Sequence, residues 1–164
     1  MNKHHERGFT LLELLVVIML IAISAGMISL ISPASAGRLA RYEARQLQEL
    51  VQSLRQDAVL NFTDYGLRIE PDGYRVMYLD AHNQWRRDKR FRLHLLPRAL
   101  RLRLEVSEAD STLDADDVAA GLPQVLMLSS DETSVFTLWI EQGSNGLVSL
   151  YSDGIGDVQL EVLN

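Results

Sequence analysis

The first third of the chain is dominated by apolar residues in two successive patterns. Residues 9–31 are almost wholly apolar, and these 23 residues in a helix would extend about 34 Å, which is sufficient to cross a bilayer. From residue 38 to residue 62 the apolar positions recur at helical spacing and form one stripe, at Leu39, Leu47, Leu50, Val51, Leu54 and Ala58. We therefore predict one long helix over residues 9–62, with an apolar first half and an amphipathic second half.

Pro33 lies between these two halves, where it marks a kink or the start of a new helix. The charged residues of the amphipathic half, including Glu43 and Asp57, are expected on the faces away from the apolar stripe. The stripe itself should pack against a sheet.

After Asn61 the hydrophobic period changes from 3.6 to 2 residues, which is typical of half-buried strands. Turn residues such as Pro71, Asp72 and Gly73 separate the alternating stretches. About eight strands follow, at residues 66–70, 74–79, 91–95, 100–106, 124–128, 135–140, 146–151 and 156–162. A helix followed by a run of strands indicates an α+β fold, with mostly antiparallel strands in two sheets or one strongly bent sheet.

The charge balance excludes some classes of partner and site. The formal net charge of −6 argues against a general nucleic-acid binder. The absence of cysteine excludes disulfides and thiolate metal sites.

The basic residues Lys3 and Arg7 precede the apolar run, so the positive-inside rule places the N-terminus in the cytoplasm and the C-terminal domain in the periplasm.

Two stretches of the C-terminal domain carry charge of one sign. Residues 86–103 contain eight basic residues and one acid, and residues 105–117 contain six acids and no base. The arginines are best explained as solvent-facing residues of alternating strands, as at Arg101 and Arg103, with an electropositive docking face as the alternative. The acidic connection, residues 107–123, is long for a compact domain and could contact a neighbouring subunit or bind a cation weakly.

The apolar run has two interpretations. Ala34, Ser35 and Ala36 match the cleavage site of an ordinary secretory signal. Against this interpretation, the run is long for such a signal and contains Glu13, although a buried carboxylate is unfavourable in a bilayer. These observations alone leave both interpretations open.

The hexapeptide Gly8-Phe9-Thr10-Leu11-Leu12-Glu13 resembles the class III signal of type IV pilins and their relatives. The resemblance implies that a prepilin peptidase cleaves between Gly8 and Phe9 and that Phe9 becomes N-methylated, while the apolar helix is retained. It also implies that Glu13 is the acid that stands at a fixed distance from the new N-terminus. Cleavage creates an ammonium group on Phe9, which is costly in a low-dielectric bundle unless it is paired. Glu13 of an adjacent subunit would pair with it and set the register; the alternative is that Glu13 merely reaches the headgroups.

The C-terminal half is similar to the H-type minor pseudopilins of type II secretion, the GspH class. The similarity rests on residues 47–58 (LQELVQSLRQDA), Gly66-Leu67-Arg68, Asp72-Gly73-Tyr74, Trp85, Pro123-Gln124-Val125-Leu126 and Phe136-Thr137-Leu138. One departure is Asp131-Glu132-Thr133-Ser134, where the family often has a glycine and a proline.

The resemblance implies a pilin-like subunit with a cleaved leader at 1–8, a transmembrane and assembly helix at 9–31, an amphipathic continuation at 32–62 and a periplasmic β domain at 63–164. It would be a single-pass protein of the bacterial inner membrane that assembles into the periplasmic pseudopilus, near its tip, and assists the export of folded proteins across the outer membrane. Its partners would be other minor pseudopilins, the major pseudopilin, prepilin peptidase and the inner-membrane assembly platform. A minor pilin of a type IV pilus is the first alternative, and an uncleaved membrane-anchored binding or sensor module is the second.

Catalytic and metal motifs are absent from the sequence. His82 and His94 have no recognisable metal spacing, and His94 alternates with leucines as a strand residue would. The aspartates at 114, 116 and 117 lack the glycine and the terminal glutamate of a calcium loop. We therefore predict that the protein is not an enzyme and that it uses no metal or other cofactor.

Overall fold

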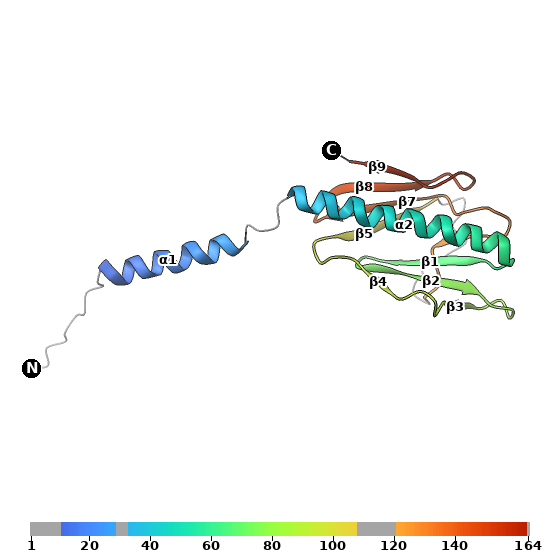
Figure 1. Cartoon of the computed structure of the whole chain (residues 1–164), viewed down its shortest axis with the longest axis horizontal. Helices are drawn as coiled ribbons and strands as arrows, with labels where there is room; N and C mark the ends of the chain where they lie inside the picture. The colour runs from blue at the N-terminus through green and yellow to red at the C-terminus, as the bar shows by residue number, and fades with distance from the viewer. Residues whose placement is uncertain (1–10, 29–32, 108–120, 164) are drawn as a thin grey trace, which may run out of the picture. The chain divides into compact units, whose positions relative to one another are not determined.

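The computed structural model describes residues 11–28, 33–107 and 121–163 (Figure 1). The chain divides into two compact units, residues 1–35 and 36–164. Helix α1, Leu11–Ile28, belongs to the first unit. Helix α2, Pro33–Asn61, begins at the proline that the sequence marks as a possible helix start. The predicted leader and the predicted continuity of the helix through residues 29–32 lie outside the described residues.

Two antiparallel sheets follow α2, as the sequence predicts. Their strands are β1 Tyr65–Glu70, β2 Gly73–Leu79, β3 Trp85–Arg87, β4 His94–Leu95, β5 Arg101–Val106, β6 Val125–Met127, β7 Phe136–Gln142, β8 Asn145–Ser152 and β9 Gln159–Val162. The first sheet has the order β3-β2-β1-β6, and β4 also pairs with β2. The second sheet has the order β5-β7-β8-β9.

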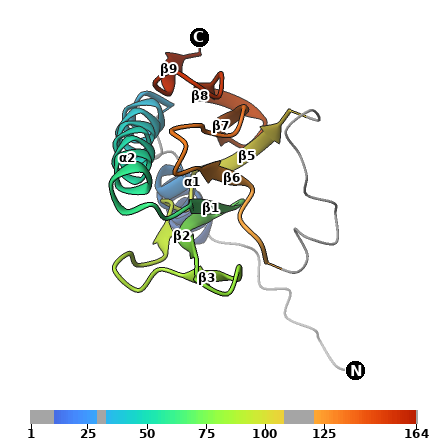
Figure 2. The same cartoon turned by 90° about the vertical axis from the view of Figure 1, so that its right-hand side faces the viewer.

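Helix α2 covers both sheets (Figures 1 and 2). The side chains that it turns inward are at most 2% exposed and recur at intervals of three or four residues, as expected for one helical face. These residues are Ala36, Ala40, Ala44, Leu47, Val51, Leu54 and Ala58. From Ala40 onward they share one core with residues of the first sheet, such as Leu67 and Met127, and of the second, such as Leu138 and Leu150. The predicted stripe is therefore confirmed, and three alanines extend it toward the start of the helix.

The strand predictions differ from the structure in two places. Trp85–Arg87 forms β3, although the sequence predicts no strand there. The stretch 91–95 was expected to be a strand throughout, but only His94 and Leu95 pair, with Tyr74 and Gly73 of β2. Both strands lie beside β2 and are too short for the alternation of apolar residues to identify them.

Candidate functional site

Glu13 is the predicted assembly residue that lies within the described part of the chain. It occupies the first turn of α1 and is exposed. A carboxylate in the first turn is favourable, because the amide groups at the start of a helix carry partial positive charge. Gly8 and Phe9, the predicted cleavage and methylation positions, lie outside the described residues.

The large side chains around Glu13 are apolar and exposed on every face of α1. From residue 11 to residue 21 their exposure ranges from 45% at Val17 to 84% at Leu11. A helix that is apolar all round is normally covered by other apolar groups. Among the described residues, however, no helix combines the length and the apolar character that a membrane crossing requires.

Glu43, His94 and Tyr74 form a polar cluster between α2 and the first sheet. The Nε2 atom of His94 lies 2.7 Å from a carboxylate oxygen of Glu43, and the His94 ring stacks on Tyr74 with ring centroids 4.8 Å apart. Burial, with a smaller contribution from the Glu43 charge, raises the pKa of Tyr74 to about 12. Glu43 was expected on the outer face of α2, but it is only 7% exposed. That expectation was wrong because His94, 51 residues away in the sequence, provides a polar partner inside.

The arginines of the basic stretch face the solvent, as predicted for Arg101 and Arg103. Several nevertheless have defined partners that the sequence did not reveal. Arg103 donates hydrogen bonds to Glu141 at 2.7 Å and Glu105 at 2.8 Å, and its guanidinium lies 3.8 Å from the centre of the Trp139 ring. Opposite-charge pairs across neighbouring strands support a sheet modestly, so these contacts suit a structural role for Arg103.

Arg55 connects α2 to two surface turns through hydrogen bonds. Its guanidinium donates to the carbonyl oxygen and side chain of Asp131, and to the carbonyl oxygens of Ile155 and Gly156. The turn that departs from the family pattern, residues 131–134, is thereby held through Arg55 rather than through a glycine and a proline. Asp131 adopts a φ of +73° in this turn, a left-handed conformation that aspartate tolerates better than most residues.

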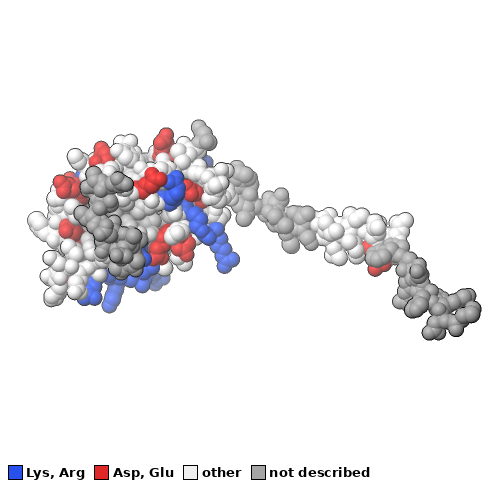
Figure 3. Space-filling view, turned by 180° about the vertical axis from the view of Figure 1, so that it is seen from behind, with Lys and Arg blue, Asp and Glu red and all other residues white. Residues whose placement is uncertain are grey.

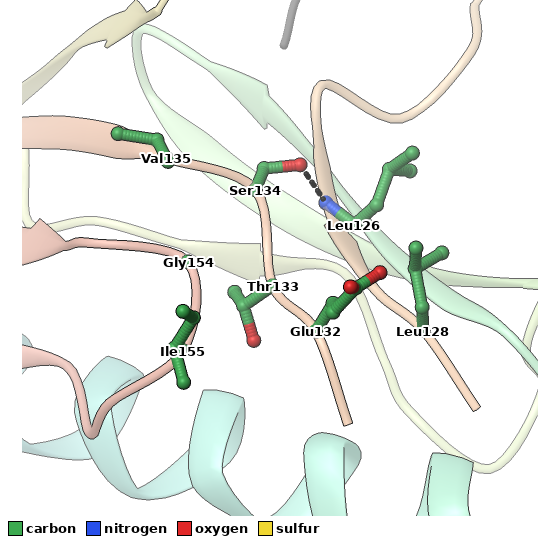
Figure 4. A pocket seen from close by; sticks show the side chains of 8 residues that line it. All are labelled: Leu126, Leu128, Glu132, Thr133, Ser134, Val135, Gly154 and Ile155. Atoms are coloured by element: carbon green, nitrogen blue, oxygen red, sulfur yellow. Dashed lines mark hydrogen bonds between the residues drawn. The ribbon is translucent and has the colours of Figure 1, made fainter. Parts of the chain in front are cut away.

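A hollow of about 400 Å³ opens beside these turns (Figure 4). It is lined by Leu126, Leu128, Glu132, Thr133, Ser134, Val135, Gly154 and Ile155. The amide of Leu126 donates a hydrogen bond of 3.0 Å to the hydroxyl of Ser134. Glu132 is the one titratable side chain of this lining.

Within the described ranges no group of three or more histidine, aspartate or glutamate side chains is placed to hold a metal ion. The aspartates at 114, 116 and 117, together with most of the acidic connection 107–123, lie outside these ranges. The expectations of no metal, no cofactor and no catalysis therefore stay predictions.

Comparisons with known proteins agree with the motif and with the fold. Residues 3–29 match the model of the prokaryotic N-terminal methylation motif. The chain is 37% identical over 170 residues to type II secretion system protein H of Pseudomonas aeruginosa, and the match covers 96% of both chains. It is 30% identical over 158 residues to type II secretion system protein H of Vibrio cholerae, with 82% of this chain and 81% of that protein covered.

Solved structures show the same fold. The crystal structure of the minor pseudopilin EpsH from the type II secretion system of Vibrio cholerae matches with a TM-score of 0.62 and 22% identity, over 77% of this chain and 96% of that chain. The solution structure of E. coli GspH matches with a TM-score of 0.53 and 16% identity, over 77% and 90% of the two chains. The resemblance inferred from the sequence is thus confirmed, and the chain belongs to the type II secretion system protein H family, the H-type minor pseudopilins.

Proposed function

We propose that this minor pseudopilin is made as a precursor that prepilin peptidase cleaves between Gly8 and Phe9. Phe9 then becomes the N-methylated first residue of a subunit that keeps its apolar helix. The methylation motif at residues 3–29 supports this step. The exposed apolar surface of α1 also supports it, because such a helix needs lipid or neighbouring helices around it.

Glu13 would join subunits in the assembled pseudopilus. Cleavage leaves a positive amine on Phe9, and its burial among apolar helices is strongly unfavourable without a partner. The Glu13 carboxylate of an adjacent subunit supplies that partner at the matching end of its own helix. A pair of this kind specifies the axial register, since any other register leaves two buried charges unpaired.

The mature subunit would stay in the inner membrane until it enters the pseudopilus. Its C-terminal domain would lie in the periplasm, near the tip, with other minor pseudopilins, above the major pseudopilin and the inner-membrane assembly platform. There it would assist the export of folded proteins across the outer membrane. The observation that carries this proposal is the similarity to type II secretion system protein H over 96% of both chains.

The processing step is tested by sequencing the N-terminus of the protein extracted from membranes. We expect the chain to begin at a methylated Phe9 in cells with active prepilin peptidase. An intact Met1 would contradict cleavage, and a start after Ala36 would indicate an ordinary secretory signal.

The assembly role of Glu13 is tested by replacing it with alanine. We expect Glu13→Ala to abolish complementation of a deletion strain in an exoprotein secretion assay, whereas Glu13→Asp, which keeps the charge, should retain part of it. Cleavage at Phe9 should continue in both variants. Normal secretion with Glu13→Ala would remove the proposed pair, and a deletion that affects piliation but not secretion would assign the protein to a type IV pilus instead.

A further inference from the structure

The C-terminal end of α2 has an unusual backbone. The chain leaves the helix through Phe62, whose φ is +49°, and the amide of Thr63 donates a hydrogen bond of 3.2 Å to the carbonyl oxygen of Ala58. A bond from a residue to the fifth one before it is typical of a Schellman helix end. The left-handed position of that motif is usually glycine, because a Cβ atom there is unfavourable.

Phe62 does not recover this cost by packing. Its side chain is 87% exposed, and its neighbours Leu60 and Val59 are 75% and 37% exposed. We call these three residues the distal patch. A bulky aromatic residue in a left-handed conformation, with this degree of exposure, gains little from packing against the residues that the structure describes. Such local strain is characteristic of functional positions.

A second feature adjoins the distal patch. A hollow of about 430 Å³, which we call the cationic hollow, is lined by Thr63, Tyr65, Tyr78, Arg87, Asp88, Lys89 and Arg90. Thr63 directly follows Phe62 in the chain. Arg90 links the hollow to α2, since its guanidinium lies 3.7 Å from Asp57, and Asp57 and Leu60 are three residues apart on one helical face.

The cationic hollow carries an excess of positive charge. Arg90 is balanced by Asp88, at 2.8 Å, and by Asp57. Arg87 and Lys89 are exposed, and neither forms an ion pair with the residues that the structure describes. Figure 3 shows lysine and arginine side chains gathered along the lower edge of the domain, where Figure 1 places β2 and β3. The surface therefore attracts carboxylates.

We propose that the distal patch and the cationic hollow together dock a neighbouring subunit of the pseudopilus, through an apolar side chain flanked by carboxylates. The inference rests on the proposed function for the nature of that neighbour. Exposed aromatic residues next to arginine and tyrosine are the combination that dominates binding energy in protein interfaces. The positive charge of the cationic hollow would guide an acidic partner to this surface and exclude basic ones.

The structure disfavours two other occupants. A second copy packed by two-fold symmetry would bring two cationic hollows face to face, which places like charges together. A membrane surface is also a poor fit, because the patch lies at the C-terminal end of α2, a helix of 29 residues and about 43 Å, whereas the apolar segment precedes the N-terminal end of that helix in the chain.

The first experiment identifies the neighbour. Photo-crosslinking p-benzoylphenylalanine is placed at position 62 of the full chain, in cells that express the complete secretion system. Position 155 is the control, because Ile155 is 78% exposed and belongs neither to the distal patch nor to the cationic hollow. We expect an adduct from position 62 with another pseudopilin, through a peptide that contains aspartate or glutamate. An adduct only with a second copy of this chain, or only with lipid, or no adduct, would overturn the proposal.

The second experiment separates docking from folding. Phe62→Gly should leave the thermal unfolding midpoint of the full chain in detergent unchanged or higher, since glycine suits the backbone there. The same variant should reduce secretion at least fivefold in the deletion strain. Arg87→Glu combined with Lys89→Glu should also reduce it, whereas Arg98→Glu, an exposed control outside the hollow, should not.

The results distinguish the two proposals. If the deletion strain secretes normally, the proposed function fails. If the wild-type chain restores secretion and Phe62→Gly restores it equally well, the proposed function stands and the docking surface is wrong.

Discussion

Position 73 does not accommodate a side chain. A Cβ atom on Gly73 would overlap the carbonyl oxygen of His94, which lies on the neighbouring strand β4. Since a backbone atom of a paired strand cannot move aside easily, we expect Gly73→Ala to reduce the free energy of unfolding by about 2 to 3 kcal/mol. Urea denaturation of residues 33–164 measures this change.

Gly37 provides the matched control for that substitution. A Cβ atom at this position of α2 would meet nothing within 4 Å, so Gly37→Ala should be neutral or stabilising by up to about 1 kcal/mol, the difference in helix propensity. Equal effects of the two substitutions would contradict a steric role for Gly73.

At the residue scale, a role can be predicted from the sequence where the residues that define it are close together in the chain. The N-terminal methylation motif, matched over residues 3–29, is readable because Gly8, Phe9 and Glu13 stand at fixed spacing within a few residues. The burial of Glu43 is not readable, because its partner His94 is brought to it only by the packing of α2 on β2 and β4. Phe62 gives no sequence signal either, since a helix end without glycine is not recognised as a left-handed turn.

At the scale of the elements, Arg55 connects α2 to the turns at residues 131 and 155–156. Its side chain is 15% exposed, so these charge-assisted hydrogen bonds are partly shielded from water. We expect Arg55→Ala to lower the free energy of unfolding by about 2 kcal/mol. Hydrogen exchange should accelerate in both turns, while the amides of β7 keep their relative protection.

Arg55→Lys serves as the control for that prediction. Lysine keeps the charge but lacks the planar fork that reaches several acceptors at once. It should restore only part of the lost stability. Full restoration would show that charge alone matters at this position.

The sequence predicts an element correctly where its hydrophobic pattern extends over enough residues to show a period. The stripe of α2 and the alternation of β5 and β7 extend over six or more residues, and the structure confirms them. The strands β3 and β4 have three and two residues, too few to show a period. They exist because β2 offers hydrogen-bonding partners along its free edge, which is a property of the sheet rather than of the local sequence.

For the whole molecule, stability should decline in acid. A hydrogen bond from Arg68 and the charge of Arg75 hold the pKa of Glu70 below its ordinary value of 4.5. Amide hydrogen bonds from Gly156 and Ile155 lower the pKa of Asp153 in the same way. The unfolded chain then binds more protons, so stability is fully present above about pH 5 and is lost as pH falls through the folded pKa values.

The loss of stability in acid can be measured as the free energy of unfolding, by urea denaturation between about pH 3 and pH 7. Glu70→Gln should make the dependence shallower, because the group no longer titrates. An identical slope in the variant would contradict a contribution from Glu70.

Alkaline conditions should destabilise the domain through Tyr74. Its pKa is raised to about 12, from 10.0, by burial and by the charge of Glu43. The folded state therefore keeps the phenol proton that the unfolded chain loses first, so stability is present below pH 10 and declines as pH rises toward 12. Tyr74→Phe should flatten this part of the profile, and an unchanged decline in the variant would contradict the assignment.

The way in which α2 lies on the domain has a mechanical consequence. Its inward-facing residues contact both sheets along most of the helix, from Ala40 to Ala58. A force along the helix axis therefore acts on all of these contacts at the same time, parallel to the interface between α2 and the sheets. The contacts do not break one after another. Close packing transmits such a load with little deformation. A domain without a single disulfide can in this way withstand tension that is applied along α2.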